Sequence, residues 1–324
     1  MKAAVLHRLG GVPHWEEIAE PVAADGEERI EVTAAPLNNI DKVRADGSHY
    51  SVRSGEHAAD GLPAVPGVIG AGLLPDGRRV LFGSRCGTMA QYSVARPEMT
   101  FPIPAGVRDA VAAAAWNPGL SAWLALGWRC KIEPGQTVLI LGATGVTGKL
   151  AVQAARHFGA GHVIAAGRNQ QVLDALPGLG ASATIQLGQP DDELAAAFAG
   201  EFRAHGCDVV LDYLWGRPTE VLLGAVTHYD IQARAQRIRL LQAGEMAGTA
   251  ITLPAAVLRS GGVEILGQGT GTMPPLDAIT GMLAELLELL AAGRLRVDVD
   301  EVPLSAVSDV WTRDQRGRRP VFIP

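Results

Sequence analysis

A glycine-rich stretch, "ATGVTG", carries the clearest chemical signal in the sequence. It matches the dinucleotide-binding pattern Gly-x-Gly-x-x-Gly with alanine in the first place, and a small residue there still permits the tight turn. The six residues are Ala143, Thr144, Gly145, Val146, Thr147 and Gly148. A loop for nucleoside triphosphates does not fit, because such a loop needs glycine at position 143 and serine or threonine at position 150, where this chain has Ala143 and Leu150.

The segments around this stretch are those that a phosphate site requires. Thr137–Leu141, "TVLIL", is a β-branched and apolar run that predicts a buried strand, and apolar residues four apart between Val146 and Phe158 predict a helix. A strand-to-helix turn directs backbone N–H groups and the positive end of the helix dipole at one point. We interpret the turn as a dinucleotide site; the alternative is a turn that only packs a helix on a sheet.

Arg168 follows the next predicted strand, "HVIAA", twenty residues after Gly148. Sites selective for NAD usually have Asp or Glu there to accept from the ribose 2′-hydroxyl, whereas an arginine can receive the 2′-phosphate of NADP. A guanidinium offers fork-like, charge-assisted hydrogen bonds to phosphate. The sequence therefore predicts NADPH as the cofactor, with Gly167, Arg168 and Asn169 among its binding residues. The alternative is an exposed arginine before a helix that Asn169 caps.

Strand and helix patterns divide the chain into two kinds of region. Up to about Ala115, short apolar runs broken by Gly, Pro and Asp predict β-rich structure. From Leu120, strand-like runs alternate with longer helical ones, which predicts βαβ units and a parallel sheet covered on both faces. Near the end, "PLDAITGMLAELLELLAAGRL" predicts an amphipathic helix and "RRPVFIP" a closing strand.

Composition excludes several classes of protein. The net charge is −6, with 28 basic and 34 acidic residues spread along the chain, so the sequence has no basic block for nucleic acid. Cys86, Cys130 and Cys207 lie far apart and form no CxxC pair, which argues against a disulfide framework and favours a reducing, cytoplasmic location. We find no export signal and no apolar run long enough to span a bilayer.

The order and spacing of several motifs resemble the medium-chain dehydrogenase/reductase superfamily, specifically its zinc-free quinone oxidoreductase branch. The motifs are "MKAAVLHRLGG", "PLNNID", "PGVIGAG", "RRVLFGSRCGTMAQYSV", "IEPGQTVLILGATGVTG", "DVVLD" and "AAGRLRVDVDEVPLSAVSDVW". The resemblance implies an α/β protein with two domains. A GroES-like β-barrel substrate domain would comprise residues 1–117 and 272–324, and a doubly wound Rossmann domain would comprise residues 118–271.

Departures from the zinc alcohol dehydrogenases of that superfamily indicate chemistry without a metal. Those enzymes have a cysteine within the segment "PLNNID" and His-Glu where this chain has Val68 and Ile69, which cannot coordinate a metal. The four cysteines of their structural zinc lobe are also absent, so Cys86 is interpreted as a buried small residue. We expect no metal site.

The resemblance also implies catalytic residues. It places Asn38 and Asp41 near the nicotinamide or the substrate, and a histidine or tyrosine of "GSHYS" over the active site, so His49 or Tyr50 is a candidate donor of a proton or hydrogen bond. Alternatively, Asp41 is the N-cap of a short helix, "KVRAD", Asn38 ends a strand, and Tyr50 belongs to a solvated loop.

Further cofactor residues follow from the same resemblance. Ser121 would lie near the nicotinamide ribose and amide, and Gly267, Gln268 and Gly269 near the nicotinamide. Trp215 stands where relatives usually have a small residue, which would narrow the pocket. The segment before Gly267, "VEIL", corresponds to an edge strand that often pairs across a dimer, so we expect a homodimer.

The sequence thus predicts an NADPH-dependent reductase that transfers hydride to a quinone or an α,β-unsaturated carbonyl, because both place negative charge on an oxygen that hydrogen-bond donors stabilise. Two alternatives stay open: an NADPH-binding structural or redox-sensing protein with little turnover, and an enoyl reductase of one pathway whose acceptor contacts the "GEHAAD" loop. A short-chain dehydrogenase is excluded, because no Tyr is followed four residues later by Lys.

Overall fold

The computed structural model describes residues 1–49, 52, 61–227, 237–315 and 317–324. They divide into two compact units. The first unit comprises Met1–Asn117 and Leu283–Pro324, and the second comprises Pro118–Met282. The two boundaries fall within the helices α3 (Asp109–Trp123) and α9 (Leu276–Ala291).

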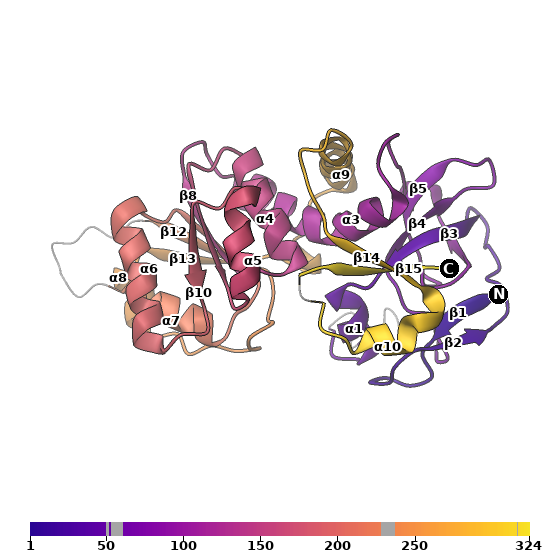
Figure 1. Cartoon of the computed structure of the whole chain (residues 1–324), viewed down its shortest axis with the longest axis horizontal. Helices are drawn as coiled ribbons and strands as arrows, with labels where there is room; N and C mark the ends of the chain where they lie inside the picture. The colour runs from indigo at the N-terminus through magenta and orange to yellow at the C-terminus, as the bar shows by residue number, and fades with distance from the viewer. Residues whose placement is uncertain (50–51, 53–60, 228–236, 316) are drawn as a thin grey trace. The chain divides into compact units, whose positions relative to one another are not determined.

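A six-stranded parallel sheet forms the centre of the second unit (Figure 1). Its strands, in spatial order, are β10 (Ala183–Gln186), β9 (His162–Gly167), β8 (Thr137–Leu141), β11 (Val209–Asp212), β12 (Ile238–Gln242) and β13 (Val263–Gly267). All five residues of β8 are buried, as expected for a central strand covered on both faces. The strand order reverses direction between β8 and β11, which is the point where doubly wound sheets bind ligands at the carboxyl ends of their strands.

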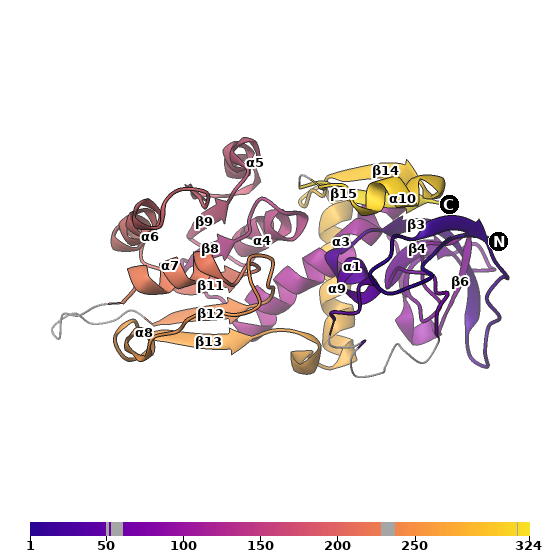
Figure 2. The same ribbon diagram turned by 90° about the horizontal axis from the view of Figure 1, so that it is seen from below.

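Helices alternate with these strands along the chain (Figure 2). They are α4 (Val146–His157), α5 (Gln170–Ala175), α6 (Asp191–His205), α7 (Arg217–Ala225) and α8 (Ala255–Ser260). Side chains of the strands and helices share one apolar core, which includes Leu139, Ile164, Phe198, Val210 and Leu222. The apolar runs and helical spacings of the sequence therefore form the expected βαβ units.

The first unit is built mainly on antiparallel strands. They are β1 (Lys2–Val5), β2 (His14–Glu17), β3 (Glu28–Pro36), β4 (Ile69–Leu73), β5 (Arg79–Gly83), β6 (Tyr92–Ala95), β7 (Thr100–Pro102), β14 (Val299–Pro303) and β15 (Arg319–Ile323). The larger sheet has the order β14-β15-β3-β4-β5-β7, and β6 also pairs with β3. Because Phe322 of β15 lies opposite Ala35 of β3, the C-terminal tail completes a sheet that the N-terminal region begins.

Short helices complete the first unit. They are α1 (Asn39–Ala45) and α10 (Val307–Trp311). The core of this unit includes Ile30, Leu37, Phe82, Trp311 and Phe322. The predicted α/β fold, with a β-rich unit returning to its start and a doubly wound parallel sheet, is confirmed.

Two local expectations differ from the structure. Helix α1 begins at Asn39, with Asn38 as its N-cap, so Asp41 is the third residue of the helix and not the N-cap of "KVRAD". Cys86 is half-buried and not buried, and none of the three cysteines forms a disulfide in the described part of the chain. Among the described residues, no helix has both the length and the apolar character needed to cross a bilayer.

Candidate functional site

In the second unit, the turn after β8 is fixed by hydrogen bonds to the neighbouring strand. The backbone N–H groups of Gly142 and Ala143 both donate to the carbonyl oxygen of Ala166 in β9, at 2.9 and 2.8 Å. The N–H of Gly145 then donates to the carbonyl oxygen of Gly142 at 3.2 Å, which closes the turn. Since Gly142 has φ +91°, glycine is the residue that enters this turn without strain.

The other two glycines of the turn have different roles. A Cβ atom on Gly148 would lie 2.2 Å from the carbonyl oxygen of Gly142 and 2.4 Å from the Cα of Ala143, so this glycine lets α4 pack against the turn. A Cβ atom on Gly145 would meet only the Gly142 oxygen, at an ordinary 3.6 Å. Packing within the protein therefore requires glycine at position 148 but not at position 145.

Helix α4 presents its N-terminus at this turn. Its first hydrogen bond inside the helix runs from the Lys149 N–H to the carbonyl oxygen of Gly145, at 2.9 Å. The N–H groups of Val146, Thr147 and Gly148 therefore have no acceptor within the helix. Three aligned donors at the positive end of a twelve-residue helix form a site suited to an anion.

The end of β9 lies directly beside the turn. A Cβ atom on Gly167 would lie 2.3 Å from Cγ2 of Thr144, so the Thr144 side chain rests on this glycine. Arg168 follows at once; it is exposed, and its guanidinium has no partner among the described residues. Asn169 accepts the N–H of Val172 at 3.2 Å and caps α5. The structure thus brings the predicted ribose residues to the same edge of the sheet as the glycine turn.

At the end of β11, the buried Asp212 holds a strained bend. Its Oδ1 accepts the N–H groups of Leu214 and Trp215, at 2.8 and 2.9 Å, and its Oδ2 accepts the Thr219 hydroxyl at 2.6 Å. Trp215 has φ +55°, a left-handed conformation that is unfavourable for a bulky side chain. Burial raises the pKa of Asp212, and the three donated hydrogen bonds oppose that rise.

Ser121, Tyr213 and Gln268 form a polar group within the second unit. The Gln268 Nε2 donates to the carbonyl oxygen of Ser121 at 3.0 Å. Burial raises the pKa of Tyr213, and the nearby Ser121 side chain opposes that rise. The Gln268 Oε1 is buried without a hydrogen-bond partner in the described part of the chain, whereas the buried Tyr213 hydroxyl lies beside the Ser121 side chain. Buried polar atoms without partners are costly, and such atoms are candidates for binding a ligand.

Gly267 and Gly269, the remaining predicted cofactor residues, stand on either side of Gln268 in the chain. Gly267 is the last residue of β13, and Gly269 precedes a short 3-10 helix, Thr270–Thr272. The Gln268 N–H donates to the carbonyl oxygen of Gln242 at 2.9 Å, so the backbone of this loop is tied to the end of β12. These residues therefore extend from the carboxyl edge of the parallel sheet.

In the first unit, Asn38 and Asp41 close the start of α1. The Asp41 Oδ2 accepts the Asn38 N–H at 2.8 Å, and its Oδ1 accepts the Val68 N–H at 3.0 Å. Burial raises the pKa of Asp41 to about 6, against the lowering effect of these hydrogen bonds and of the charges on Arg319 and Arg44. The Asn38 amide is 2% exposed, and neither its nitrogen nor its oxygen has a partner among the described residues. Buried polar atoms of this kind are candidates for binding a ligand.

Arg319, near the C-terminus, supports the same region. Its Nη1 donates to the carbonyl oxygen of Leu37 at 2.8 Å and to Oε1 of Gln315 at 3.1 Å. Burial lowers the pKa of Arg319 to about 10, and the nearby Asp41 charge opposes this. A buried arginine next to a buried carboxyl compensates part of the cost of burying either charge.

Tyr50 and His49 are the two candidates for the donor of a proton or hydrogen bond. Tyr50 lies outside the described residues, so its role as a proton donor stays a prediction. His49 is described and half-buried; its N–H donates to the carbonyl oxygen of Val43 at 3.0 Å.

Several known proteins are similar to this chain in sequence or in fold. No protein-family model matches it. A probable NADPH-dependent quinone reductase from Emericella nidulans is 31% identical over 218 residues, which is 64% of this chain and 60% of that protein. A spectinabilin polyketide synthase system protein from Streptomyces orinoci is 32% identical over 295 residues, 86% of this chain but 12% of that protein. The solved quinone oxidoreductase of Thermus thermophilus has a TM-score of 0.79 at 27% identity, with both chains fully covered.

In sequence and fold, the chain is similar to quinone oxidoreductases of the medium-chain dehydrogenase/reductase superfamily. It spans 60% of the length of the Emericella nidulans protein and 12% of the length of the Streptomyces orinoci protein.

Sequence reasoning missed two contributors in this quinone oxidoreductase-like protein. Arg319 contacts Leu37 from more than 280 positions away, and "RRPVFIP" contains no signal for a buried charge. Thr219 completes the Asp212 network, and its only sequence signal is its place seven residues after an aspartate that ends a strand. Both depend on tertiary packing and not on local pattern.

Proposed function

We propose that this protein is an NADPH-dependent reductase that transfers hydride to a quinone or an α,β-unsaturated carbonyl without using zinc. The observation that carries the proposal is the open N-terminus of α4 beside Arg168, whose guanidinium has no partner in the described chain. The names of the relatives support it: the Emericella nidulans protein is called a probable NADPH-dependent quinone reductase, and the Thermus thermophilus enzyme was solved with NADPH.

The residues of the glycine turn fit the phosphates of the cofactor. The N–H groups of Val146, Thr147 and Gly148 would hold the pyrophosphate at the helix N-terminus, and the open space at Gly145 would admit it. The Arg168 guanidinium would pair with the 2′-phosphate, which a carboxylate in its place would repel. We propose that Ala143, Thr144, Gly167 and Asn169 surround these phosphate contacts.

The polar group around Ser121 fits the other end of the cofactor. A nicotinamide carboxamide carries both a donor and an acceptor, and the Gln268 Oε1, which lacks a partner among the described residues, offers an acceptor for its N–H group. Gly267 and Gly269 complete the proposed nicotinamide segment. When bound, the dihydronicotinamide supplies the hydride.

On the acceptor side, we assign Asn38 the role of stabilising negative charge. Its buried amide N–H has no partner among the described residues, so it can donate to the oxygen of a quinone or enone as charge develops there. Asp41 holds the Asn38 backbone and the start of α1. Tyr50 is our candidate for the proton that the oxygen takes up after hydride transfer.

The chemistry of the residues near Asp41 supports a mechanism without a catalytic metal. Val68 and Ile69 carry no ligand atoms in their side chains, and each oxygen of the Asp41 carboxylate already accepts a backbone N–H. A quinone or an α,β-unsaturated carbonyl suits this arrangement. Hydride addition to either places negative charge on an oxygen that N–H groups can stabilise, so no Lewis acid is required. Similarity to polyketide synthases keeps enones beside quinones as candidate acceptors.

The edge of the parallel sheet supports a homodimer as part of the proposal. Within the described residues, β13 is the last strand of the sheet and pairs on one side only, with β12. A strand edge of this kind is a place where a second chain adds its own strand.

The test is steady-state oxidation of NADPH and, in parallel, NADH, with an ortho-quinone, a para-quinone and several enones. We expect kcat/KM with NADPH to exceed that with NADH, and Arg168→Ala to reduce the NADPH value roughly tenfold to a hundredfold while leaving the NADH value unchanged. Arg259→Ala, which removes an exposed arginine of α8, is the matched control. Absence of NADPH binding would overturn the proposal. NADPH binding without turnover of any acceptor would favour the redox-sensing alternative.

A further inference from the structure

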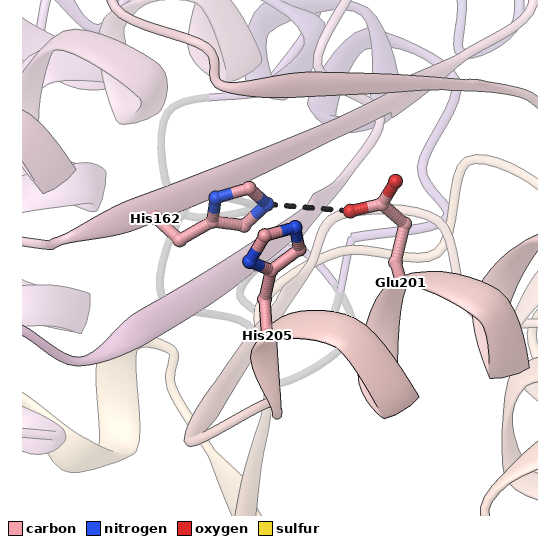
Figure 3. A group of neighbouring side chains, drawn as sticks. All are labelled: His162, Glu201 and His205. Atoms are coloured by element: carbon pink, nitrogen blue, oxygen red, sulfur yellow. Dashed lines mark hydrogen bonds and ion pairs between the residues drawn. The ribbon is translucent and has the colours of Figure 1, made fainter.

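A cluster of histidine and glutamate side chains lies at the opposite edge of the parallel sheet from the glycine turn. His162 is the first residue of β9, whereas the glycine turn follows the last residue of β8, and the two strands are parallel. Glu201 and His205 come from the last turns of α6, four residues apart on one face of the helix. Figure 3 shows the three side chains pointing toward one another.

The three side chains are close enough to share one ion. The His162 Nε2 lies 3.3 Å from Oε2 of Glu201, and one ligand atom from each of the three residues lies within 4.8 Å of the others. Ligand atoms in a tetrahedral zinc site lie about 3.4 Å apart, given bonds of about 2.1 Å. The ligand atoms are thus near one another but not yet at bonding separation, so the side chains must move for an ion to bind.

One ring must turn for such binding. The imidazoles of His162 and His205 are stacked, with centroids 3.8 Å apart and planes at 16°. The lone pairs of imidazole nitrogens lie in the ring planes, so two stacked rings cannot both aim at one ion. His205 is exposed and His162 only partly so, which makes His205 the ring with room to rotate.

The backbones that carry the cluster are held in place. The Thr137 hydroxyl donates to the carbonyl oxygen of His205 at 2.8 Å, which fastens the end of α6 to the start of β8. Thr137 in turn lies opposite His162 in the sheet. The end of α6 is also the negative end of a fifteen-residue helix, which favours a cation. The backbone around the cluster is thus held in place, whereas the His205 side chain has room to rotate.

We propose that His162, Glu201 and His205 form a binding site for one divalent transition-metal ion of the zinc type, separate from the proposed cofactor residues. Two imidazoles and one carboxylate are ligands that zinc and its neighbours accept, whereas calcium and magnesium prefer oxygen alone. The bound ion would join α6 to β9, and the fourth coordination position would be left to water. The cluster escaped sequence reasoning because only the four-residue spacing of Glu201 and His205 is visible in the sequence.

The test uses the full chain, freed of any histidine tag and treated with a chelator, and titrates it with Zn²⁺ against a coloured chelator of known affinity. We expect one ion per chain, and at least tenfold weaker binding in each of His205→Ala, Glu201→Gln and His162→Gln. His7→Ala is the matched control, because His7 is also paired with a glutamate, Glu16, at 2.9 Å but has no third ligand within the described residues.

A second readout reports the ligand set directly. Co²⁺ added to the same protein should give visible absorption bands of a low-coordinate site, and His205→Ala should abolish them. His205 is exposed, so this variant is expected to fold even where His162→Gln does not. Failure of the wild type to bind Zn²⁺, or equal affinity of wild type and His205→Ala, would overturn the proposal. Since the assay needs neither NADPH nor turnover, its outcome is independent of the proposed reductase activity.

Discussion

The Asp41 carboxylate accepts the backbone N–H of Val68 at 3.0 Å and so joins the start of α1 to the segment before β4. The Asn38 N–H donates to the other oxygen at 2.8 Å, so the buried carboxylate has two backbone donors. These hydrogen bonds lower the pKa of Asp41, but burial raises it by more, so the stability of the protein should depend on pH.

Asp41 should make the protein less stable as pH rises from about 4 to 6. Burial raises its pKa to about 6 in the folded chain, against an ordinary value of 3.8, so the folded state binds the proton more tightly than the unfolded chain does. The protonated Asp41 side chain stabilises the folded state by roughly 3 kcal/mol below pH 4, and this contribution is lost as pH rises through 6. Urea unfolding of wild type and Asp41→Asn at pH 4, 5, 6 and 7 should show the wild type losing stability relative to the variant.

The exposed Asp25 provides the control for this measurement. Asp25→Asn removes an exposed carboxyl group. The difference in free energy of unfolding between this variant and wild type should therefore not show the pH dependence expected for Asp41→Asn. A difference between wild type and Asp41→Asn that stays constant from pH 4 to 7 would contradict the raised pKa.

The two inner glycines of the turn should respond differently to alanine. At Gly148 the new Cβ would overlap backbone atoms at 2.2 and 2.4 Å, so Gly148→Ala should lower the free energy of unfolding by about 1–3 kcal/mol. At Gly145 the Cβ would meet protein only at 3.6 Å, so Gly145→Ala should change stability by less than about 1 kcal/mol. The same methyl group would stand where we place the pyrophosphate.

Binding measurements separate these effects. Gly145→Ala should raise the Kd for NADPH at least tenfold while its urea unfolding curve stays near that of wild type. Normal NADPH affinity in Gly145→Ala would mean that no phosphate approaches this glycine, and the proposed location of the pyrophosphate would have to be abandoned.

The second unit could be predicted from the sequence almost element by element, because its signals are local. An apolar run such as Thr137–Leu141 and the four-residue spacing of the helix that follows are set by neighbours in the chain, and the observed bounds of β8 and α4 agree with them. Arg168 and Gly167 could be located for the same reason, since a strand end at a known distance from the glycines places them.

Features that depend on distant contacts could not be predicted. The burial of Arg319 requires Leu37 and Asp41 from the other end of the chain, and the His162 cluster requires α6 to pack at the start of β9. The start of α1 differs from the prediction because an aspartate at the third helical position resembles one at the N-cap when only the sequence is seen. In each case the missing information is tertiary.

Thr219 should contribute to stability through the buried Asp212. Its hydroxyl donates to Oδ2 at 2.6 Å, and both residues are fully buried. Thr219→Val keeps the shape but leaves one carboxylate oxygen short of a donor, so unfolding should become easier by about 1–3 kcal/mol. The control is Thr184→Val in β10, which changes an exposed threonine and should be nearly neutral in the same urea titration.

The side-chain amides of Asn38 and Asn169 differ in burial and in hydrogen bonding, so substitution by alanine should affect stability differently at the two positions. Asn169 accepts the Val172 N–H as the cap of α5, so Asn169→Ala should cost about 1 kcal/mol. The Asn38 amide is buried without a partner among the described residues, so Asn38→Ala removes two unsatisfied atoms and should leave stability unchanged or higher.

Asn38→Ala should lower the reductase activity without lowering the stability of the protein. If the Asn38 amide serves the acceptor oxygen, Asn38→Ala should lower kcat with the best quinone or enone at least tenfold and leave the Kd for NADPH unchanged, since the proposed contact is with the acceptor. Urea unfolding of this variant tests the expected stability, and steady-state kinetics on the same preparation test the expected loss of kcat. A loss of stability comparable to that of Asn169→Ala would show that the amide has a structural partner in solution, and unchanged kcat would remove Asn38 from the proposed chemistry.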